Sequence, residues 1–234
     1  MQKHRFLLAS LLSFILLGCA TAPDEWKGTI EAQPPVSIDD TQMSGNNAIW
    51  QWHKNKWFYR GGNKVQPAYE SWDYDPLGLV FRFQSPAQLN LYRGKPHSLY
   101  LKVFQLSDLK VFKDIASTPA GIRELLTSAK EDIDASVLSE NEIDIPPNDY
   151  HLLAIDRFKE TRFVAIVAGY FQLNSENSVQ IFEIPSVANR SEELNFNMKD
   201  VNPFAEPAVS EAGRIKAWVD LGVTKISRLQ MLAQ

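Results

Sequence analysis

The sequence predicts a mainly β protein, a two-sheet β-sandwich with a small helical insertion, preceded by a signal peptide and an aromatic-rich arm. Apolar and polar residues alternate in several segments after residue 77, which is the periodicity of β-strands. Helical spacing replaces that alternation only at about residues 107–138. Counting gives seven or eight strands, a pattern typical of a sandwich with helices on one side.

Residues 1–18 have the layout of a secretory signal peptide. A basic start with Lys3 and Arg5 precedes an apolar run of about a dozen residues, too short for a membrane span of ~20 residues. Gly18 and Cys19 at its end resemble the bacterial lipobox, in which the cysteine thiol is alkylated by diacylglycerol before cleavage. We therefore expect diacylglycerol and an N-acyl chain, such as palmitate, on Cys19. The alternative is an ordinary signal peptide with an incidental cysteine.

The composition of the mature chain limits its function. Loss of Lys3 and Arg5 with the signal changes the net charge from −4 to −6, which argues against nucleic acid as a partner. Once Cys19 is acylated no thiol remains for a disulfide, a cysteine zinc site or a nucleophile. Ala20 follows in place of the aspartate that retains lipoproteins in the inner membrane. We therefore expect a lipid-anchored protein on the periplasmic face of the outer membrane.

Two segments precede the predicted sandwich. Residues 19–47 are polar and contain prolines and glycines, which predicts a flexible tether. Residues 48–76 form an aromatic-rich arm, which we expect to be extended and packed on the main domain. The alternative is that these aromatic residues stack on glycan or peptidoglycan. The arm holds four of the six tryptophans: Trp50, Trp52, Trp57 and Trp72.

The predicted sandwich domain covers residues 77–185. Residues 77–83 and 98–106 alternate as strands and are predicted to form a hairpin, joined by a long polar loop. Long loops often carry binding sites. Two helices are expected in the insertion, the second beginning at Thr118 and Pro119.

Further strands are predicted in the rest of the chain. They lie at residues 143–145, 150–155, 162–171 and 178–184, and the segment 162–171 is apolar enough to be buried on both faces. Residues 186–212 are a predicted linker. Residues 213–234 are predicted to form a C-terminal strand and tail. A helix through Ile215, Val219, Ile226 and Leu229 is the alternative.

The sequence gives no positive evidence of an enzyme. It contains no His-x-x-x-His pair, no Gly-x-Ser-x-Gly elbow and no phosphate-binding loop, since Gly61-Gly62 lacks the required spacing. Asp156-Arg157 at a strand end is more typical of a structural ion pair than of an acid–base site. We expect no catalytic residues, no metal, no small-molecule substrate and no cofactor other than the lipid on Cys19.

Four stretches, in order, resemble the outer-membrane lipoproteins of type VI secretion systems, the TssJ/SciN family. Asp156-Arg157 fits the same pattern, and the match covers residues 77–185. The resemblance implies a transthyretin-like sandwich and a non-enzymatic role. The stretches are Leu89-Asn90 with Gly94-Lys95-Pro96-His97-Ser98-Leu99, then Val103-Phe104-Gln105-Leu106 followed by Phe112, then Gly121-Ile122 with Leu125-Leu126, and Val167-Ala168-Gly169-Tyr170.

The resemblance also implies a partner and a contact loop. Such a lipoprotein tethers the periplasmic part of the inner-membrane protein TssM to the outer membrane, through the loop between the first two strands. On this chain the loop is residues 87–96. The expected anchors are Leu89, Leu91 and Tyr92, unless the two leucines pack inward as core. Arg93 and Lys95 would orient the partner. The expected contact residues are Leu89, Asn90, Leu91, Tyr92, Arg93, Gly94 and Lys95.

Overall fold

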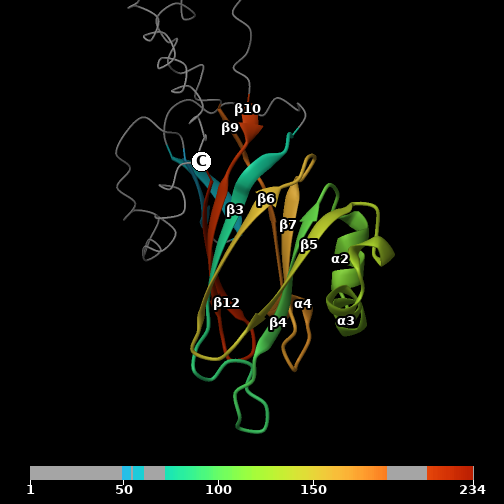
Figure 1. The fold of residues 1–234 in the computed structure, drawn as a ribbon, viewed down its shortest axis with the longest axis vertical. Helices are drawn as coiled ribbons and strands as arrows, with labels where there is room; N and C mark the ends of the chain where they lie inside the picture. Colours follow the sequence, from blue (N-terminus) through green and yellow to red (C-terminus); the bar gives the residue numbers. More distant parts are fainter. Residues whose placement is uncertain (1–48, 54, 61–71, 189–209, 234) are drawn as a thin grey trace, which may run out of the picture.

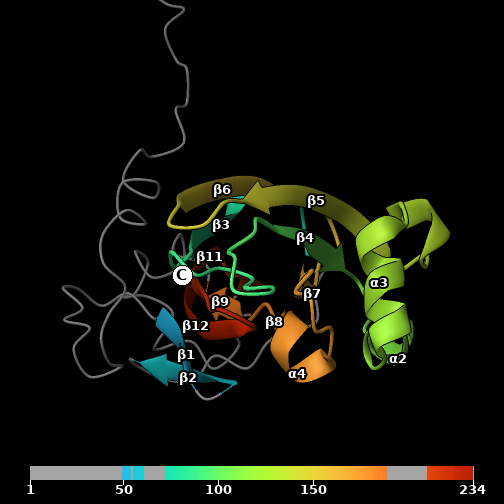
Figure 2. The same cartoon turned by 90° about the horizontal axis from the view of Figure 1, so that it is seen from below.

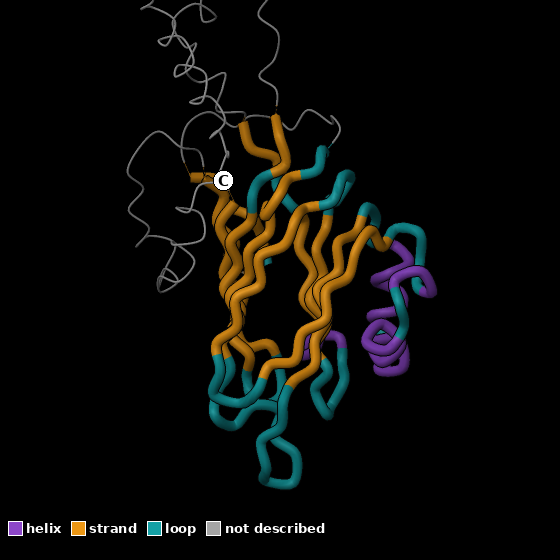
Figure 3. Tube along the Cα trace, viewed as in Figure 1, coloured by secondary structure: helices purple, strands orange, loops and turns teal. Residues whose placement is uncertain are grey.

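Two β-sheets packed face to face form the body of the molecule (Figures 1 and 3). The computed structural model describes residues 49–53, 55–60, 72–188 and 210–233. The predictions for the signal peptide, Cys19, the tether and Gly61-Gly62 lie outside these residues. One sheet has six strands in the order β2-β1-β12-β11-β3-β6, the other has four in the order β5-β4-β7-β8, and β9 and β10 form a separate ribbon.

The strand bounds are β1 Ile49–His53, β2 Lys56–Arg60, β3 Asp75–Gln84, β4 Leu99–Leu106, β5 Val137–Ile145, β6 Tyr150–Arg157, β7 Phe163–Ala168, β8 Val179–Glu183, β9 Ser186–Ala188, β10 Ser210–Ala212, β11 Ile215–Leu221 and β12 Ile226–Ala233. The predicted β-sandwich with helices is thus confirmed. The described residues form twelve strands where seven or eight were expected.

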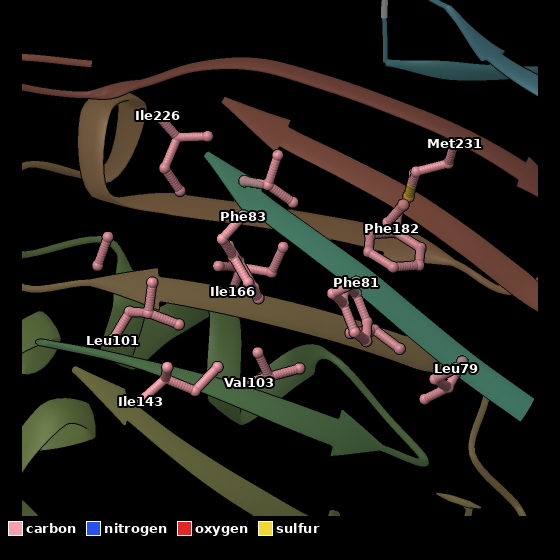
Figure 4. Close-up of a cluster of buried hydrophobic side chains, with 14 of the residues drawn as sticks. Leu79, Phe81, Phe83, Leu101, Val103, Ile143, Ile166, Phe182, Ile226 and Met231 are labelled. Carbon is pink, nitrogen blue, oxygen red and sulfur yellow. The ribbon is translucent and has the colours of Figure 1, made fainter. Parts of the chain in front are cut away.

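The main core lies between the facing sheets (Figure 4). Alternate residues of β3 point inward, where Leu79, Phe81 and Phe83 are fully buried. Val103 of β4 and Ile166 of β7 meet them from the other sheet. Each fully buried side chain of this size contributes about 1.5–3 kcal/mol of transfer free energy. This core holds the two sheets together and makes the sandwich a rigid support for its loops.

The helical insertion covers the outer face of the four-stranded sheet (Figure 2). It contains α2 (Lys110–Ala116), α3 (Pro119–Thr127) and a short 3-10 turn, η1 (Lys130–Asp132). The predicted cap is confirmed, because the Thr118 hydroxyl accepts a hydrogen bond from the Gly121 N–H at 3.0 Å. A Cβ at Gly121 would lie 1.9 Å from the Ile115 carbonyl oxygen, so this close approach of α2 and α3 requires glycine.

The predicted hairpin of the first two sandwich strands is wrong. β3 belongs to the six-stranded sheet and pairs with β6 and β11, whereas β4 belongs to the other sheet and pairs with β5 and β7. The connecting residues 85–98 therefore cross from one sheet to the other. Alternation identified each strand but carries no information about which sheet it joins.

Three other predictions need correction. The insertion ends before Val137, because β5 begins there and extends well beyond the predicted residues 143–145. The predicted tail is the strand β12, which excludes the alternative of a C-terminal helix. The ends of the predicted linker, residues 186–188 and 210–212, pair as β9 and β10, and residues 189–209 lie outside the description. A one-turn helix, α4 (Ser175–Ser178), precedes β8 and was not predicted.

The β1–β2 hairpin of the aromatic arm extends the six-stranded sheet beside β12. Trp52 packs edge-on against Trp57 and against Phe182 of β8. The Trp57 indole N–H donates to the Glu183 carbonyl at 2.6 Å, so the hairpin also contacts the second sheet. The expectation of an extended arm packed on the main domain is confirmed for these residues.

The pairing register defines two opposite ends of the sandwich. Trp50, Ala233, Ile215, Leu79 and Ile155 lie in one row across the six-stranded sheet. We call the end beyond this row, where β1 begins and the C-terminus lies, the entry pole (Figure 1). The other end, where β3 leads into residues 85–98, is the loop pole, at the bottom of Figure 1.

No helix among the described residues is long and apolar enough to cross a membrane.

Candidate functional site

The loop between β3 and β4, residues 85–98, projects from the loop pole (Figure 1), and its tip is a tight two-residue turn. The Tyr92 N–H donates to the Lys95 carbonyl at 2.9 Å, and the Lys95 N–H donates back to Tyr92 at 3.0 Å. Arg93 and Gly94 at the tip have φ angles of 50° and 75°, the left-handed pair of a type I′ turn. The glycine is required here because it adopts positive φ without strain. The turn holds Tyr92, Arg93 and Lys95 out into solvent.

Hydrogen bonds join this loop to its neighbours at the loop pole. The buried Asn90 side chain donates to the Ser98 carbonyl and accepts from the Phe171 N–H, both at 3.1 Å. The Leu91 N–H donates to the Val223 carbonyl, in the turn between β11 and β12, at 3.2 Å. Three connections that are distant in sequence thus form one supported surface.

An exposed aromatic cluster lies on this surface. The rings of Tyr92 and Phe171 stack with centroids 4.3 Å apart and an interplanar angle of 18°. His97 packs edge-on against Phe171 at 5.1 Å. Tyr92 is 43% exposed and Phe171 50% exposed. The two rings are neighbours, they are exposed to water, and the loops that carry them are held rigidly. An apolar surface of a binding partner could cover them.

Basic side chains surround the cluster. Arg93 lies over the Tyr92 ring, its guanidinium carbon 5.2 Å from the centroid, and Lys95 is exposed beside it. Lys225 is exposed in the adjoining turn between β11 and β12. Glu176 is the exposed acidic residue in the connection that carries Phe171. The tip of the β3–β4 loop is therefore basic, on a chain whose net charge is −4, whereas Asp149 and Asp220 are acidic residues elsewhere at this pole.

The structure divides the predicted contact residues into two groups. Leu89 is fully buried in the main core, so its prediction as an exposed anchor is wrong and the alternative of inward packing holds for it. Asn90 is also buried and supports the loop from within. Leu91 is half-buried. The side chains that reach solvent are Tyr92, Arg93 and Lys95.

Phe171 was missed by the sequence reasoning. It lies directly after Val167-Ala168-Gly169-Tyr170, one of the stretches that carried the resemblance, yet nothing in the sequence placed it against Tyr92. The stacking joins residues 79 positions apart, and it follows from strand pairings that bring the β3–β4 and β7–β8 connections to the same pole.

Asp156 and Arg157 lie at the entry pole and have structural partners other than each other. Asp156 accepts from the Tyr74 hydroxyl and from the Leu77 N–H, and these two hydrogen bonds lower the pKa of its carboxyl group. The buried Arg157 guanidinium donates to the carbonyls of Ala212 and Gly213 at 2.9 and 3.1 Å. Both residues therefore have structural roles, and the carboxylate beside the Arg157 guanidinium is that of Asp75, at 3.7 Å. Within the described ranges, no group of three or more His, Cys, Asp or Glu side chains could hold a metal ion.

Comparison with known proteins gives a family match over residues 78–200, more than half of the chain. The family is described as Type VI secretion lipoprotein, VasD, EvfM, TssJ. Among curated proteins, none matches the sequence significantly.

Two solved structures illustrate the likeness in shape. Lip of Serratia marcescens, a membrane-bound component of the type VI secretion system, is 18% identical, with a TM-score of 0.45 over 63% of this chain and 95% of its own. The lipoprotein TssJ1 of Pseudomonas aeruginosa is 14% identical, with a TM-score of 0.44 over 69% of this chain and 96% of its own. On the family match over residues 78–200, the chain belongs to the type VI secretion lipoprotein family.

Proposed function

We propose that this protein is a lipid-anchored member of the type VI secretion membrane complex that links the outer membrane to a TssM-type inner-membrane protein. Acyl chains on Cys19 hold it on the periplasmic face of the outer membrane, and residues 19–47 form the tether. The loop pole binds the periplasmic part of the partner. The observation that carries the proposal is the stacked, exposed Tyr92–Phe171 pair on a member of a secretion lipoprotein family.

The physical character of the loop pole supports a protein contact. Tyr92 and Phe171 can be desolvated by an apolar side chain of the partner, and aromatic residues of this kind dominate binding energy at interfaces. Arg93 and Lys95 at the rim would favour a partner with acidic residues around its contact surface. They would raise the association rate more than the affinity. Because the type I′ turn is already ordered, the loop loses little conformational entropy on binding.

The role is a mechanical link and not catalysis. The buried amide of Asn90 at this pole is engaged in two hydrogen bonds that fix loops. Glycan binding by the aromatic arm is the less favoured function, because Trp52, Trp57 and Trp72 are packed against the main core. Their buried ring surface is not free to stack on a sugar.

The test is co-purification of the lipidated protein with the periplasmic part of its inner-membrane partner. We expect the double change Tyr92→Asp and Phe171→Asp to abolish co-purification, because it places two charges where apolar rings must be desolvated. Val111→Asp is the matched control, since Val111 on α2 is 41% exposed and lies away from the loop pole. We expect this control to retain the partner.

Circular dichroism and urea unfolding of each variant would establish that the fold is intact. Retention of the partner by a folded double variant would disprove the assignment of the loop pole. Loss of the partner in the Val111→Asp variant as well would place the contact elsewhere.

A further inference from the structure

We propose that a second exposed aromatic pair, Tyr74 and Phe158 at the entry pole, rests on the phospholipid surface to which Cys19 is attached. This inference depends on the lipid anchor in the proposed function, and it adds a site that orients the anchored protein. Tyr74 is 53% exposed and Phe158 45% exposed. Their rings meet edge to face, with centroids 6.4 Å apart and an interplanar angle of 82°.

The pair is held in place by a hydrogen-bonded platform. The Tyr74 hydroxyl donates to Asp156, and this hydrogen bond raises the pKa of the phenol. The Phe158 N–H donates to the buried Gln105 side chain at 2.8 Å, and the same side chain donates to the Asp156 carbonyl at 2.9 Å. The Glu160 N–H donates to the Trp72 carbonyl at 2.7 Å. Both segments that carry the rings are thus fixed to the sandwich, so the exposure of the rings is built into the fold.

The pair lies at the end of the molecule where the chain arrives from Cys19. Tyr74 precedes β3 and Phe158 follows β6, beyond the row in which Trp50 pairs with Ala233. Four strand spacings separate β6 from β1 in the sheet order, which is about 19 Å. The aromatic pair and the start of β1 therefore share one pole.

The tether alone leaves the orientation open. The 29 residues from Ala20 to Ala48 could span up to ~100 Å when fully extended, which exceeds the size of the sandwich. A second, weak contact with the membrane would keep the entry pole toward the lipid. The loop pole would then point away from the membrane, toward the partner.

The surroundings of the pair fit a lipid interface without strong charge attraction. Basic and acidic side chains nearly balance there, four against five, so the contact should depend on the aromatic rings and change little with salt. Tyrosine and phenylalanine side chains partition into the membrane–water interface. The charged residues are Arg157, Lys159, Arg162, Arg214, Asp73, Asp75, Asp156, Glu160 and Glu183.

The experiment is hydrogen exchange on the lipidated full chain in vesicles of phosphatidylethanolamine and phosphatidylglycerol. The anchor-free Cys19→Ser chain in solution is the reference for each variant. We expect peptides covering residues 72–78 and 156–162 to exchange at least about threefold more slowly on vesicles. Phe158→Ser should abolish this difference while leaving exchange of the anchor-free chain unchanged. The matched control Phe171→Ser, an exposed ring at the other pole, should retain it.

The outcomes separate this inference from the proposed function. Equal vesicle protection in the wild type and Phe158→Ser would overturn the membrane contact, as would protection that appears only when the partner protein is added. An unmodified Cys19 in the mass spectrum would instead contradict the proposed function. Loss of the partner on Phe158→Ser would also contradict the assignment of this pole to lipid.

Discussion

At the scale of single residues, Asn90 connects two of the loops that form the surface of the loop pole. Its amide is the link between the β3–β4 connection and the backbone of Phe171, and its φ of 46° lies in the left-handed region that asparagine tolerates. The residue belongs to the stretch Leu89-Asn90 that carried the family resemblance. In the proposed function, the buried Asn90 positions the rings.

We therefore expect Asn90→Ala to weaken both stability and partner binding. Loss of two hydrogen bonds at a buried amide should lower the free energy of unfolding by about 1–3 kcal/mol. Partner affinity should fall as well, because Phe171 is no longer held against Tyr92. Urea unfolding and a binding titration measure the two effects. Gln172→Ala, an exposed amide in the same connection, should change neither; unaltered affinity in Asn90→Ala would show that the bond is not needed for the site.

At the scale of elements, the β1–β2 hairpin is where the described chain enters the sandwich, and in the proposed function it is the element to which the tether is joined. Tension on the lipid anchor would be carried by β1, which pairs with β12 through Trp50, Gln51 and Trp52. The Trp57 N–H bond to Glu183 adds a second attachment, to the other sheet. In the proposed function, the β1–β2 hairpin thus attaches the tether to the sandwich.

Trp57→Phe should loosen this attachment, because it keeps an aromatic ring but removes the indole N–H. Loss of one hydrogen bond is worth about 0.5–1.5 kcal/mol, which at 1 kcal/mol is a roughly fivefold rise in local opening. We expect cleavage of the hairpin by a protease at low concentration to become faster by about that factor, while the far-ultraviolet spectrum stays unchanged. Cleavage at the wild-type rate would contradict the importance of the Glu183 contact.

The elements also show what the sequence could and could not reveal. β3, β7 and α3 were predictable because alternation, a doubly buried apolar run and a Thr-Pro cap are local signals. β12 was missed because a register shift between Asp220 and Leu221 brings Ile226 inward, out of phase with Leu229 and Met231.

The first half of β5 was not predicted because it contains polar residues. Ser139 and Asn141 occupy positions where apolar residues would have continued the alternation of Ile143 and Ile145. The candidate site was harder to predict. The sequence indicates the loop itself, but the contact of the loop with Phe171 depends on the arrangement of strands in both sheets.

At the scale of the whole molecule, the sandwich separates two surfaces of different character. The loop pole presents a stacked aromatic pair next to a basic loop tip, and the entry pole presents an edge-to-face pair among nearly balanced charges. The core between the sheets joins them rigidly, with buried Gln105 bridging β4 and β6 near the entry pole. Such a body can transmit force from a lipid to a protein partner.

The central claim, a two-ended link, is tested most directly by sedimentation of the partner's periplasmic domain with outer-membrane vesicles. Vesicles carrying the wild-type lipoprotein should bring the domain down. Cys19→Ser protein, which we expect to remain folded and to bind the domain in solution, should leave it in the supernatant. Sedimentation of the domain to the same extent with Cys19→Ser protein would contradict the link, because attachment to the membrane would then not depend on the lipid.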